Sequence, residues 1–217
     1  MRTKICGINS IEDIDVAIRA GADALGFLVG ITHLAEDKIS NEDARVLIEK
    51  LPPFISTVAV THLTNVNEIV ELVRYLGVTT VQIHDYIPPE DVRIVRDSLR
   101  GIKIIKAVHV MEMNSIKIAK SFEPFVDAIL LDSRTKDRLG GTGITHDWNI
   151  SELIVKEIRR PIILAGGLTA DNIFDAVKKV KPFAVDVNSG VETDNRKDFN
   201  KVSKFILDAK RAESEYY

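Results

Sequence analysis

Apolar and polar positions along the chain alternate between two kinds of segment. Short runs rich in Val, Ile, Leu and Ala are separated by longer segments with the apolar spacing of amphipathic helices. The eight apolar runs begin near Thr3 (KICGI), Ala24 (LGFLV), Ile55 (STVAV), Thr79 (TVQIH), Lys103 (IIKAV), Asp127 (AILLD), Pro161 (IILAG) and Phe183 (AVDVN). We predict that each of these runs is a β-strand.

Helix start and stop residues occupy the gaps between the runs. Ser10 and Ser40 stand where they would cap a helix, Gly21 where it would end the first one, and Pro52 where it would forbid continuation of the second. The expected helices span residues 11–20, 41–51, 68–76, 88–100, 114–122, 147–159, 170–180 and 197–212. A strand followed by a helix is therefore repeated along the whole chain.

This repeat predicts an α/β fold, because helical crossovers connect strands that run parallel. Eight units with nothing left over favour a closed (β/α)8 barrel, the TIM barrel, over an open doubly wound sheet. We expect a single TIM-barrel domain over residues 1–217.

Polar residues interrupt the expected strands near their carboxyl ends. Strands covered by helices on both sides are usually apolar throughout, so these residues need an explanation. The alternation of side chains along a strand predicts that they point into the barrel, at the end where barrel enzymes build their active sites. The residues are Lys4, Cys6, Gln82, His84, Lys106, Asp132, Asp186 and Asn188. The alternative interpretation is a hydrogen-bonded polar plug in the barrel mouth.

Glycine-rich turns follow the last two strands. Gly166 and Gly167 follow the seventh strand, and Ser189 and Gly190 follow the eighth. Such turns let backbone N–H groups approach a ligand closely, and the loops after these two strands are the usual phosphate site of TIM barrels. We expect a bound anion to contact the N–H groups of Gly167 and Gly190. A third glycine-rich stretch, residues 139–143, is interpreted as a mobile cover.

Composition and charge narrow the functional classes. The 217 residues are 45% hydrophobic and 28% charged, with a net charge of −3 and no long run of like charge, which argues against binding to nucleic acid or to a membrane surface. With no signal-peptide pattern or membrane span, we expect a soluble, cytoplasmic protein. The single cysteine, Cys6, excludes an internal disulfide. Of the five histidines only His84 is expected to end a strand facing inward, which disfavours a metal-dependent epimerase.

Seven motifs resemble those of the phosphoribosylanthranilate isomerase family of tryptophan biosynthesis, in order and in spacing. They are residues 4–8 (KICGI), 21–27 (GADALGF), 81–84 (VQIH), 130–132 (LLD), 140–143 (GGTG) with 147–148 (DW), 165–168 (AGGL) and 186–192 (DVNSGVE). Together they cover nearly the whole chain. Each motif is modest by itself, whereas the ordered set is highly specific.

The resemblance implies an Amadori rearrangement, the conversion of N-(5-phosphoribosyl)anthranilate to 1-(2-carboxyphenylamino)-1-deoxyribulose 5-phosphate, without a metal or cofactor. It implies that Cys6 is the general base and Asp132 the general acid. These roles require a thiol pKa that is lowered, for which Lys4 is the candidate, and a carboxyl pKa that is raised by burial. The expected substrate contacts are Lys4, Gln82, His84, Lys106, Arg134, Gly141, Asp186 and Asn188, and the expected phosphate contacts are Gly166, Gly167, Ser189 and Gly190. The expected partner is a small-molecule phosphosugar, bound by a monomer or a homodimer.

The loop after the second strand departs from the family pattern. The family usually has an arginine there that meets the anthranilate carboxylate, whereas this chain has Asp37. The positive charge could come instead from Lys38, His33 or Arg134. The chain also departs from the family pattern at Ile144, Asp85 and residues 60–63. Two alternatives therefore stay open. One is an isomerase or epimerase of a different phosphorylated sugar or aminosugar that uses the same Cys6 and Asp132, and the other is a noncatalytic paralogue that binds a phosphometabolite.

Overall fold

Eight parallel strands form a closed barrel in the computed structural model, which describes residues 1–32, 37–133 and 145–215. Each strand pairs with the next one in the chain, and the first strand closes the ring by pairing with the eighth. The strands are β1 (Arg2–Ile5), β2 (Ala24–Leu28), β3 (Ser56–Thr61), β4 (Thr80–Ile83), β5 (Lys103–His109), β6 (Ala128–Asp132), β7 (Ile162–Leu164) and β8 (Ala184–Val187). The predicted fold class, an α/β TIM barrel, is confirmed.

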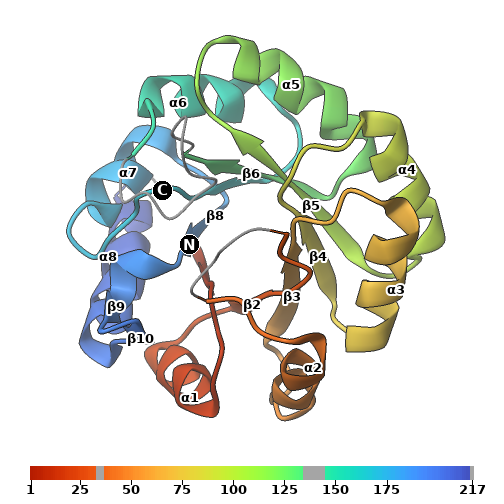
Figure 1. Ribbon diagram of the computed structural model, residues 1–217. Helices are drawn as coiled ribbons and strands as arrows, with labels where there is room; N and C mark the ends of the chain where they lie inside the picture. Colours follow the sequence, from red (N-terminus) through yellow and green to blue (C-terminus); the bar gives the residue numbers. More distant parts are fainter. Residues whose placement is uncertain (33–36, 134–144, 216–217) are drawn as a thin grey trace.

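The helices form an outer ring around the strands (Figure 1). They are α1 (Ile11–Ala20), α2 (Asn41–Glu49), α3 (Val66–Leu76), α4 (Pro89–Ser98), α5 (Asn114–Phe122), α6 (Trp148–Glu157), α7 (Ile173–Val180) and α8 (Phe199–Ser214), with short 3₁₀ helices η1 (Glu123–Phe125) and η2 (Ser189–Val191). Within the described part of the chain, none of the helices is long and apolar enough to cross a membrane.

The expected start and stop residues act as predicted in α1 and α2. Ser10 Oγ accepts a hydrogen bond of 3.2 Å from the N–H of Asp13, and Ser40 Oγ accepts one of 3.0 Å from the N–H of Asp43. Gly21 ends α1 with a φ of 92°, a left-handed conformation that favours glycine. These local signals explain why the sequence located both helices.

Two other helices begin at residues that the sequence pattern did not select. Helix α3 begins two residues earlier than predicted, because Asn65 Oδ1 accepts hydrogen bonds from the N–H groups of Asn67 and Glu68. Helix α7 begins three residues later, since the Asn172 side chain accepts a hydrogen bond from the Thr169 N–H and holds the preceding residues in a turn. Both differences arise from asparagine side chains that bond to the nearby backbone.

A small antiparallel pair of strands, which the sequence pattern did not predict, precedes the last helix. It consists of β9 (Glu192–Thr193) and β10 (Arg196–Lys197). Helix α8 therefore begins at Phe199, capped by Asp198, rather than at residue 197. The backbone N–H of Lys197 donates to Asp13 Oδ1 at 3.2 Å, which ties this pair of strands to helix α1.

The core has two layers, one between the strands and the helices and one inside the barrel. The residues buried inside the barrel are Ile105, Ala107, Ala128, Leu130, Ile163, Ala165 and Ala184 in one cluster, and Cys6, Val58 and Val60 in another. Val185 and Val187 of β8 belong to the layer between the strands and the helices. Phe183, just before this strand, is 45% exposed and lies under the guanidinium of Arg2.

Candidate active site

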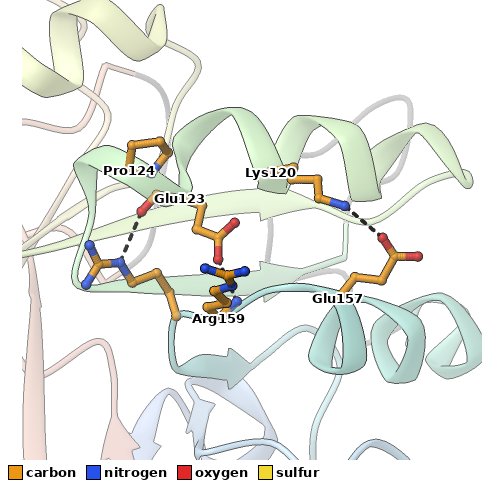
Figure 2. Close-up of a pocket in the computed structure, with 6 residues that line it drawn as sticks. Lys120, Glu123, Pro124, Glu157 and Arg159 are labelled. Atoms are coloured by element: carbon orange, nitrogen blue, oxygen red, sulfur yellow. Dashed lines mark hydrogen bonds and ion pairs between the residues drawn. The ribbon is translucent and has the colours of Figure 1, made fainter.

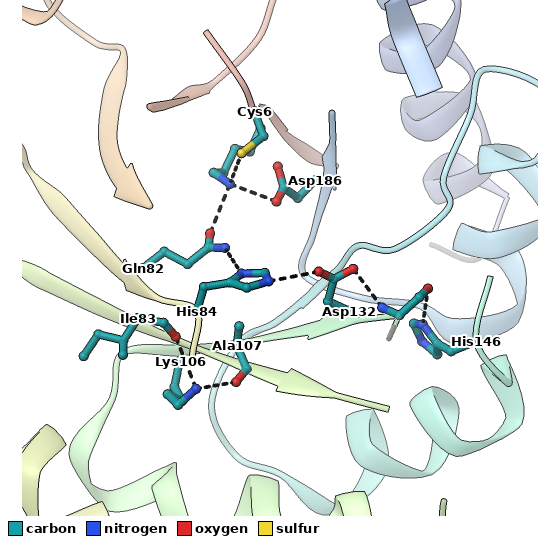
Figure 3. Close-up of polar contacts among 11 residues, drawn as sticks. Cys6, Gln82, Ile83, His84, Lys106, Ala107, Asp132, His146 and Asp186 are labelled. Carbon is teal, nitrogen blue, oxygen red and sulfur yellow. Dashed lines mark hydrogen bonds and ion pairs between the residues drawn. The ribbon is translucent and has the colours of Figure 1, made fainter. Parts of the chain in front are cut away.

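A chain of hydrogen bonds crosses the barrel at the carboxyl ends of its strands (Figure 3). Lys4 Nζ lies 3.4 Å from Cys6 Sγ and donates to Gln82 Oε1 at 3.0 Å. Gln82 Nε2 lies 3.2 Å from His84 Nδ1, and His84 Nε2 lies 3.3 Å from Asp132 Oδ2. The structure thus brings together Cys6 and Asp132, the two residues proposed as base and acid, through a continuous polar connection. We call these five residues the polar chain.

Lys4 is also paired with Asp186, across the seam between β1 and β8. Lys4 Nζ lies 2.8 Å from Asp186 Oδ2, and both residues are buried. Burial by itself lowers the pKa of Lys4, but the charges of Asp186 and Cys6 outweigh it and raise that pKa, so that the ammonium stays charged. Among the described residues, Asp186 Oδ1 has no hydrogen-bond partner. This carboxylate oxygen is therefore available to a hydroxyl group of a ligand.

The thiol of Cys6 is a weak acid in this structure. Burial raises its pKa to about 11, although the nearby charge of Lys4 acts in the opposite direction. Asp186 raises the pKa further, because its negative charge disfavours a thiolate nearby. The sequence led us to expect a lowered pKa, and this expectation is wrong for the structure as it stands. The neighbour that was expected to lower it, Lys4, is present, but burial has the larger effect.

The pKa of the Asp132 carboxyl group is lowered, whereas the acid role calls for a raised one. Burial by itself raises its pKa, as the sequence predicts, but the hydrogen bond and charge of His84 outweigh burial and lower it. The charge of His109 and the backbone N–H of Ser133, which donates to Asp132 Oδ1 at 2.8 Å, lower it further. Asp132 is therefore held as a carboxylate. The expectation of a raised pKa is wrong for this structure.

The orientation of the Gln82 amide decides which nitrogen of His84 carries the proton. An ammonium group only donates hydrogen bonds, so the Gln82 oxygen must face Lys4 and the amide N–H groups must face His84 Nδ1. Nδ1 then accepts, which leaves the proton of a neutral imidazole on Nε2, directed at Asp132. The charge on Lys4 thus fixes the orientation of the Gln82 amide, and this orientation makes His84 the hydrogen-bond donor to Asp132.

Three histidines lie side by side at the ends of β3, β4 and β5. The ring centroids of His62 and His84 are 4.7 Å apart, and those of His84 and His109 are 5.2 Å apart. The sequence pattern predicted that only His84 faces inward at the end of a strand, and this prediction is wrong, because His62 and His109 also continue the inward phase of their strands. His62 follows Val58 and Val60 in the inward phase of β3, and this alternation was the signal that could have found it.

The polar chain continues beyond Asp132 to a residue that the sequence did not single out. Ser133 Oγ lies 3.4 Å from His146 Nδ1, and His146 Nε2 lies 2.6 Å from Ser151 Oγ on α6. Burial lowers the pKa of His146, which favours the neutral ring. His146 thus fixes the backbone that follows Asp132.

Lys106 does not join the polar chain, although the sequence placed it among the substrate contacts. In the strand register it lies between Ile83 and Ile129, which face the helices. Its ammonium donates to the carbonyl oxygens of Ile83 at 3.3 Å and Ala107 at 2.6 Å. It also lies over the ring of Phe122, 5.4 Å from the ring centroid. The side chain therefore occupies the layer between the strands and helix α5.

Tight packing is one reason why the turns after β7 and β8 contain glycine. Gly166 and Gly167 have φ angles of 79° and 66°, and a Cβ on Gly166 would lie 2.2 Å from Ser133 Oγ. A Cβ on Gly190 would lie 1.9 Å from the carbonyl oxygen of Leu168, so the turns after β7 and β8 are in direct contact. Within the described residues no hydrogen bond uses the N–H of Gly167. Ser189 and Gly190 lie in the short 3₁₀ helix η2, which follows β8.

Asn188 contacts Asp37, the residue that stands where the family usually has arginine. Asn188 Nδ2 donates to Asp37 Oδ2 at 2.8 Å, and Lys197 Nζ donates to Asn188 Oδ1 at 2.7 Å. Lys197 also pairs with Glu192. Asp37 is thus tied to the turn after β8. The other residues considered for this end of the site are partly outside the described residues: His33, Arg134, Gly141, Ile144 and the glycine-rich stretch 139–143.

A hollow on the outside of the barrel lies at the opposite end from the polar chain (Figure 2). It is lined by residues of α5, η1 and α6 and of the turn before β7, and several of its polar groups are already bonded to one another. Lys120 bonds to Glu157 at 3.0 Å, and the Glu123 carboxylate accepts from the N–H of Arg159 at 2.6 Å. Because catalytic groups of TIM barrels lie at the carboxyl ends of the strands, this hollow is not the candidate site.

A closed (β/α)8 barrel with a thiol, an ammonium, an imidazole and carboxylates buried at the carboxyl ends of its strands defines a TIM-barrel enzyme. Comparisons with known proteins give the family. The model of the N-(5′-phosphoribosyl)anthranilate isomerase family matches residues 3–208, and the chain belongs to this family. The resemblance seen in the sequence motifs is confirmed, and the chain is an isomerase.

Similar proteins cover almost the full length of the chain. N-(5′-phosphoribosyl)anthranilate isomerase 2 of Methanosarcina mazei is 44% identical over 213 residues, which are 97% of this chain and 94% of that protein. The crystal structure of phosphoribosyl anthranilate isomerase from Thermotoga maritima has 36% identity, a TM-score of 0.86, and coverage of 97% of this chain and 99% of the other. A structure of the isomerase in complex with reduced 1-(o-carboxyphenylamino)-1-deoxyribulose 5-phosphate has 34% identity, a TM-score of 0.83 and the same coverage.

Proposed function

We propose that the chain converts N-(5′-phosphoribosyl)anthranilate to 1-(2-carboxyphenylamino)-1-deoxyribulose 5-phosphate, with Cys6 as the general base and Asp132 as the general acid. Protonation of the ring oxygen breaks its bond to C1 and gives a Schiff base. Removal of the C2 proton then gives an enolamine, which tautomerises to the ketose. Protons are exchanged but none is gained overall. The observation that carries the proposal is the polar chain, which joins Cys6 to Asp132 across the barrel mouth.

Sharing of the Lys4 ammonium supports the role of Cys6. Lys4 lies 3.4 Å from the sulfur but only 2.8 Å from Asp186. A substrate hydroxyl that donates to Asp186 would weaken the hold of this carboxylate on Lys4. The ammonium would then stabilise a thiolate more strongly, which lowers the pKa of Cys6 from its value of about 11.

The hydrogen bond from His84 supports the role of Asp132. Asp132 is held as a carboxylate, so it needs a proton before it acts as an acid. His84 Nε2 lies 3.3 Å away and carries a proton directed at this carboxylate. We infer that this hydrogen bond orients Asp132 toward the ring oxygen, and that Asp132 takes up from the solvent the proton it transfers.

The phosphate group of the substrate is assigned to the turns after β7 and β8. The N–H groups of Gly167 and Gly190 remain its expected contacts, and the hydrogen-bonding capacity of the Gly167 N–H supports this assignment. Gly166 and Ser189 complete the expected set. Gln82, Arg134, Gly141 and Asn188 remain expected substrate contacts.

Turnover of the purified protein tests the proposal directly. Loss of the fluorescence of phosphoribosylanthranilate reports the reaction. Cys6→Ala and Asp132→Asn should each lower kcat by about a hundred- to ten-thousandfold, the usual contribution of a general acid or base. Asp85→Asn, which removes a carboxylate next to His84, is the matched control and should retain turnover within a few fold. Near-normal turnover by Cys6→Ala or Asp132→Asn would exclude these roles.

Asp37 favours one second candidate, the isomerisation of a different phosphorylated aminosugar. Its carboxylate is tied to Asn188 at the place where the family usually offers an arginine to the anthranilate carboxylate. A panel of phosphorylated aminoaldoses with and without an acidic aromatic group distinguishes the two candidates. Absence of any turnover, with inorganic phosphate still raising the Tm, would favour a noncatalytic binding role. A cytoplasmic location and a monomeric or homodimeric state stay predictions.

A further inference from the structure

We propose that His84, His109 and Asp132 form a binding site for a divalent transition-metal ion of the zinc or cobalt type. Their ligand atoms all lie within 4.8 Å of one another. The three residues come from the carboxyl ends of three adjacent strands, β4, β5 and β6, which pair directly. They are therefore held by the barrel itself rather than by long loops.

The spacing of these atoms suits a single metal ion. Zinc binds imidazole nitrogen and carboxylate oxygen at about 2.0–2.2 Å, so two ligands in a tetrahedral arrangement are roughly 3.4 Å apart. His84 Nε2 and Asp132 Oδ2 are already 3.3 Å apart. Because all the ligand atoms lie within 4.8 Å of one another, the largest adjustment needed to reach tetrahedral spacing is about 1.4 Å.

The chemistry of the ligands also selects this class of metal. Two imidazoles and one carboxylate form a three-ligand set that leaves coordination positions for water or another ligand, as in open transition-metal sites. Magnesium and calcium prefer all-oxygen ligands, so the two histidines disfavour them. His84 and Asp132 are each 8% exposed, and a buried carboxylate gains more from a cation than an exposed one does.

Gln82 makes the strength of metal binding depend on the polar chain. In the present hydrogen bonding His84 carries its proton on Nε2, the nitrogen that faces Asp132. A metal bound at Nε2 displaces this proton, and the neutral ring is then protonated on Nδ1. Gln82 would have to turn over to accept from Nδ1, and its N–H groups would then face the ammonium of Lys4. A glutamate at position 82 would accept hydrogen bonds from both neighbours at once.

Metal binding also has a consequence for the proposed reaction. A carboxylate oxygen coordinated to a metal does not carry the proton that the acid role requires, so a bound ion would inhibit turnover. This consequence rests on the proposed function, whereas the binding itself does not. Free transition-metal ions should therefore inhibit the enzyme by occupying Asp132, the proposed general acid.

Direct binding of Co²⁺ and Zn²⁺ to chelator-treated protein tests the site. Visible absorption of Co²⁺ and equilibrium dialysis of Zn²⁺ should give one ion per chain. His109→Gln, with His109→Asn as a second variant, should weaken binding at least about tenfold, and Gln82→Glu should strengthen it by about ten- to a hundredfold, the usual range for an outer carboxylate on a metal-bound histidine. Glu157→Gln, which changes an exposed carboxylate at the opposite end of the barrel, is the matched control and should bind like the parent. The Tm of each metal-free variant reports whether it is folded.

Three results would overturn the proposal. The first is metal binding that is unchanged in both folded His109 variants, and the second is Gln82→Glu binding no more tightly than the parent. The third is an intense thiolate-to-cobalt band in the near ultraviolet, which would identify Cys6 as the ligand instead. Turnover measured at the same metal concentrations separates the two proposals. Binding at His84, His109 and Asp132 without inhibition would leave the metal site intact and contradict the acid role of Asp132.

Discussion

Lys4 Nζ lies 3.4 Å from Cys6 Sγ, and both groups are buried at the end of the same strand. An ammonium at this distance favours the thiolate, yet burial, the larger effect, raises the thiol pKa to about 11. The pair therefore holds a protonated thiol next to a cation. How far the ammonium stabilises a thiolate depends on its other ionic partner, which in this structure is the Asp186 carboxylate.

The alkylation of Cys6 should follow this high pKa. Because only the thiolate reacts, the rate with iodoacetamide should rise about tenfold per pH unit between pH 7 and 10, without a plateau. Asp186→Asn removes a charge that raises the pKa, so the same rate should be reached at a lower pH in that variant. A rate that levels off below pH 9 in the parent protein would contradict the predicted protonation state.

Removing Lys4 should destabilise the protein through the charge that it leaves behind. Lys4→Met strands the Asp186 carboxylate in a buried position, which costs about 3–5 kcal/mol in the free energy of unfolding. The double variant Lys4→Met with Asp186→Asn should recover a large part of this loss, because no buried charge remains. Urea denaturation of the single and double variants measures both values. Additive losses in the double variant would mean that the two groups are not coupled.

Lys106 should make stability depend on pH in the alkaline range. Burial lowers its pKa from 10.5 to about 7 in the folded chain. Between these two pH values the unfolded chain binds more protons than the folded chain, so the free energy of unfolding rises with pH. Lys106→Met should lose this dependence and be more stable than the parent at pH 7, by up to a few kcal/mol, since each pKa unit corresponds to about 1.4 kcal/mol. Denaturation curves at pH 7 and pH 10 provide the comparison, and parallel curves for the two proteins would refute the prediction.

Gly166→Ala should damage both stability and turnover. The added Cβ would lie 2.3 Å from the backbone nitrogen of Ser133 and 2.8 Å from Asp132 Oδ1, at a φ of 79°. Gly77→Ala is the matched control, with a φ of 67° and no atom within 4 Å of the added Cβ. The control should lose only the backbone cost of about 1–2 kcal/mol, whereas Gly166→Ala should lose about 1–3 kcal/mol more through overpacking. Equal losses, with turnover preserved in both, would show that the contact with Asp132 is unimportant.

Most of the barrel was predictable because its signals are local. Caps such as Ser10 and Ser40 bond to backbone groups three residues away, so they are visible in the sequence itself. The start of α3 was missed although Asn65 carries the same kind of signal. The pair β9 and β10 was missed because each strand is only two residues long, too short to show an alternation of apolar and polar residues.

The candidate site was predictable only as far as the phase of each strand was assigned correctly. Lys106 shares its phase with Ile104 and Val108, both of which face the helices, whereas His109 shares the inward phase of Ile105 and Ala107. With that alternation, His109 rather than Lys106 would have been predicted to face into the barrel from β5. The pKa values of Cys6 and Asp132 were not predictable, because they depend on a balance between burial and neighbours that are distant in the sequence.

The pairing of Lys4 with Asp186 joins residues that are 182 positions apart in the chain. Lys4 belongs to β1 and Asp186 to β8, so the two side chains can pair only when the ring of strands closes. A contact of such long range forms late, because closing a long loop costs entropy before the contact can compensate. Burial of Lys4 next to the Cys6 thiol is therefore tied to closure of the barrel, because the ammonium gains its carboxylate partner only when β1 pairs with β8.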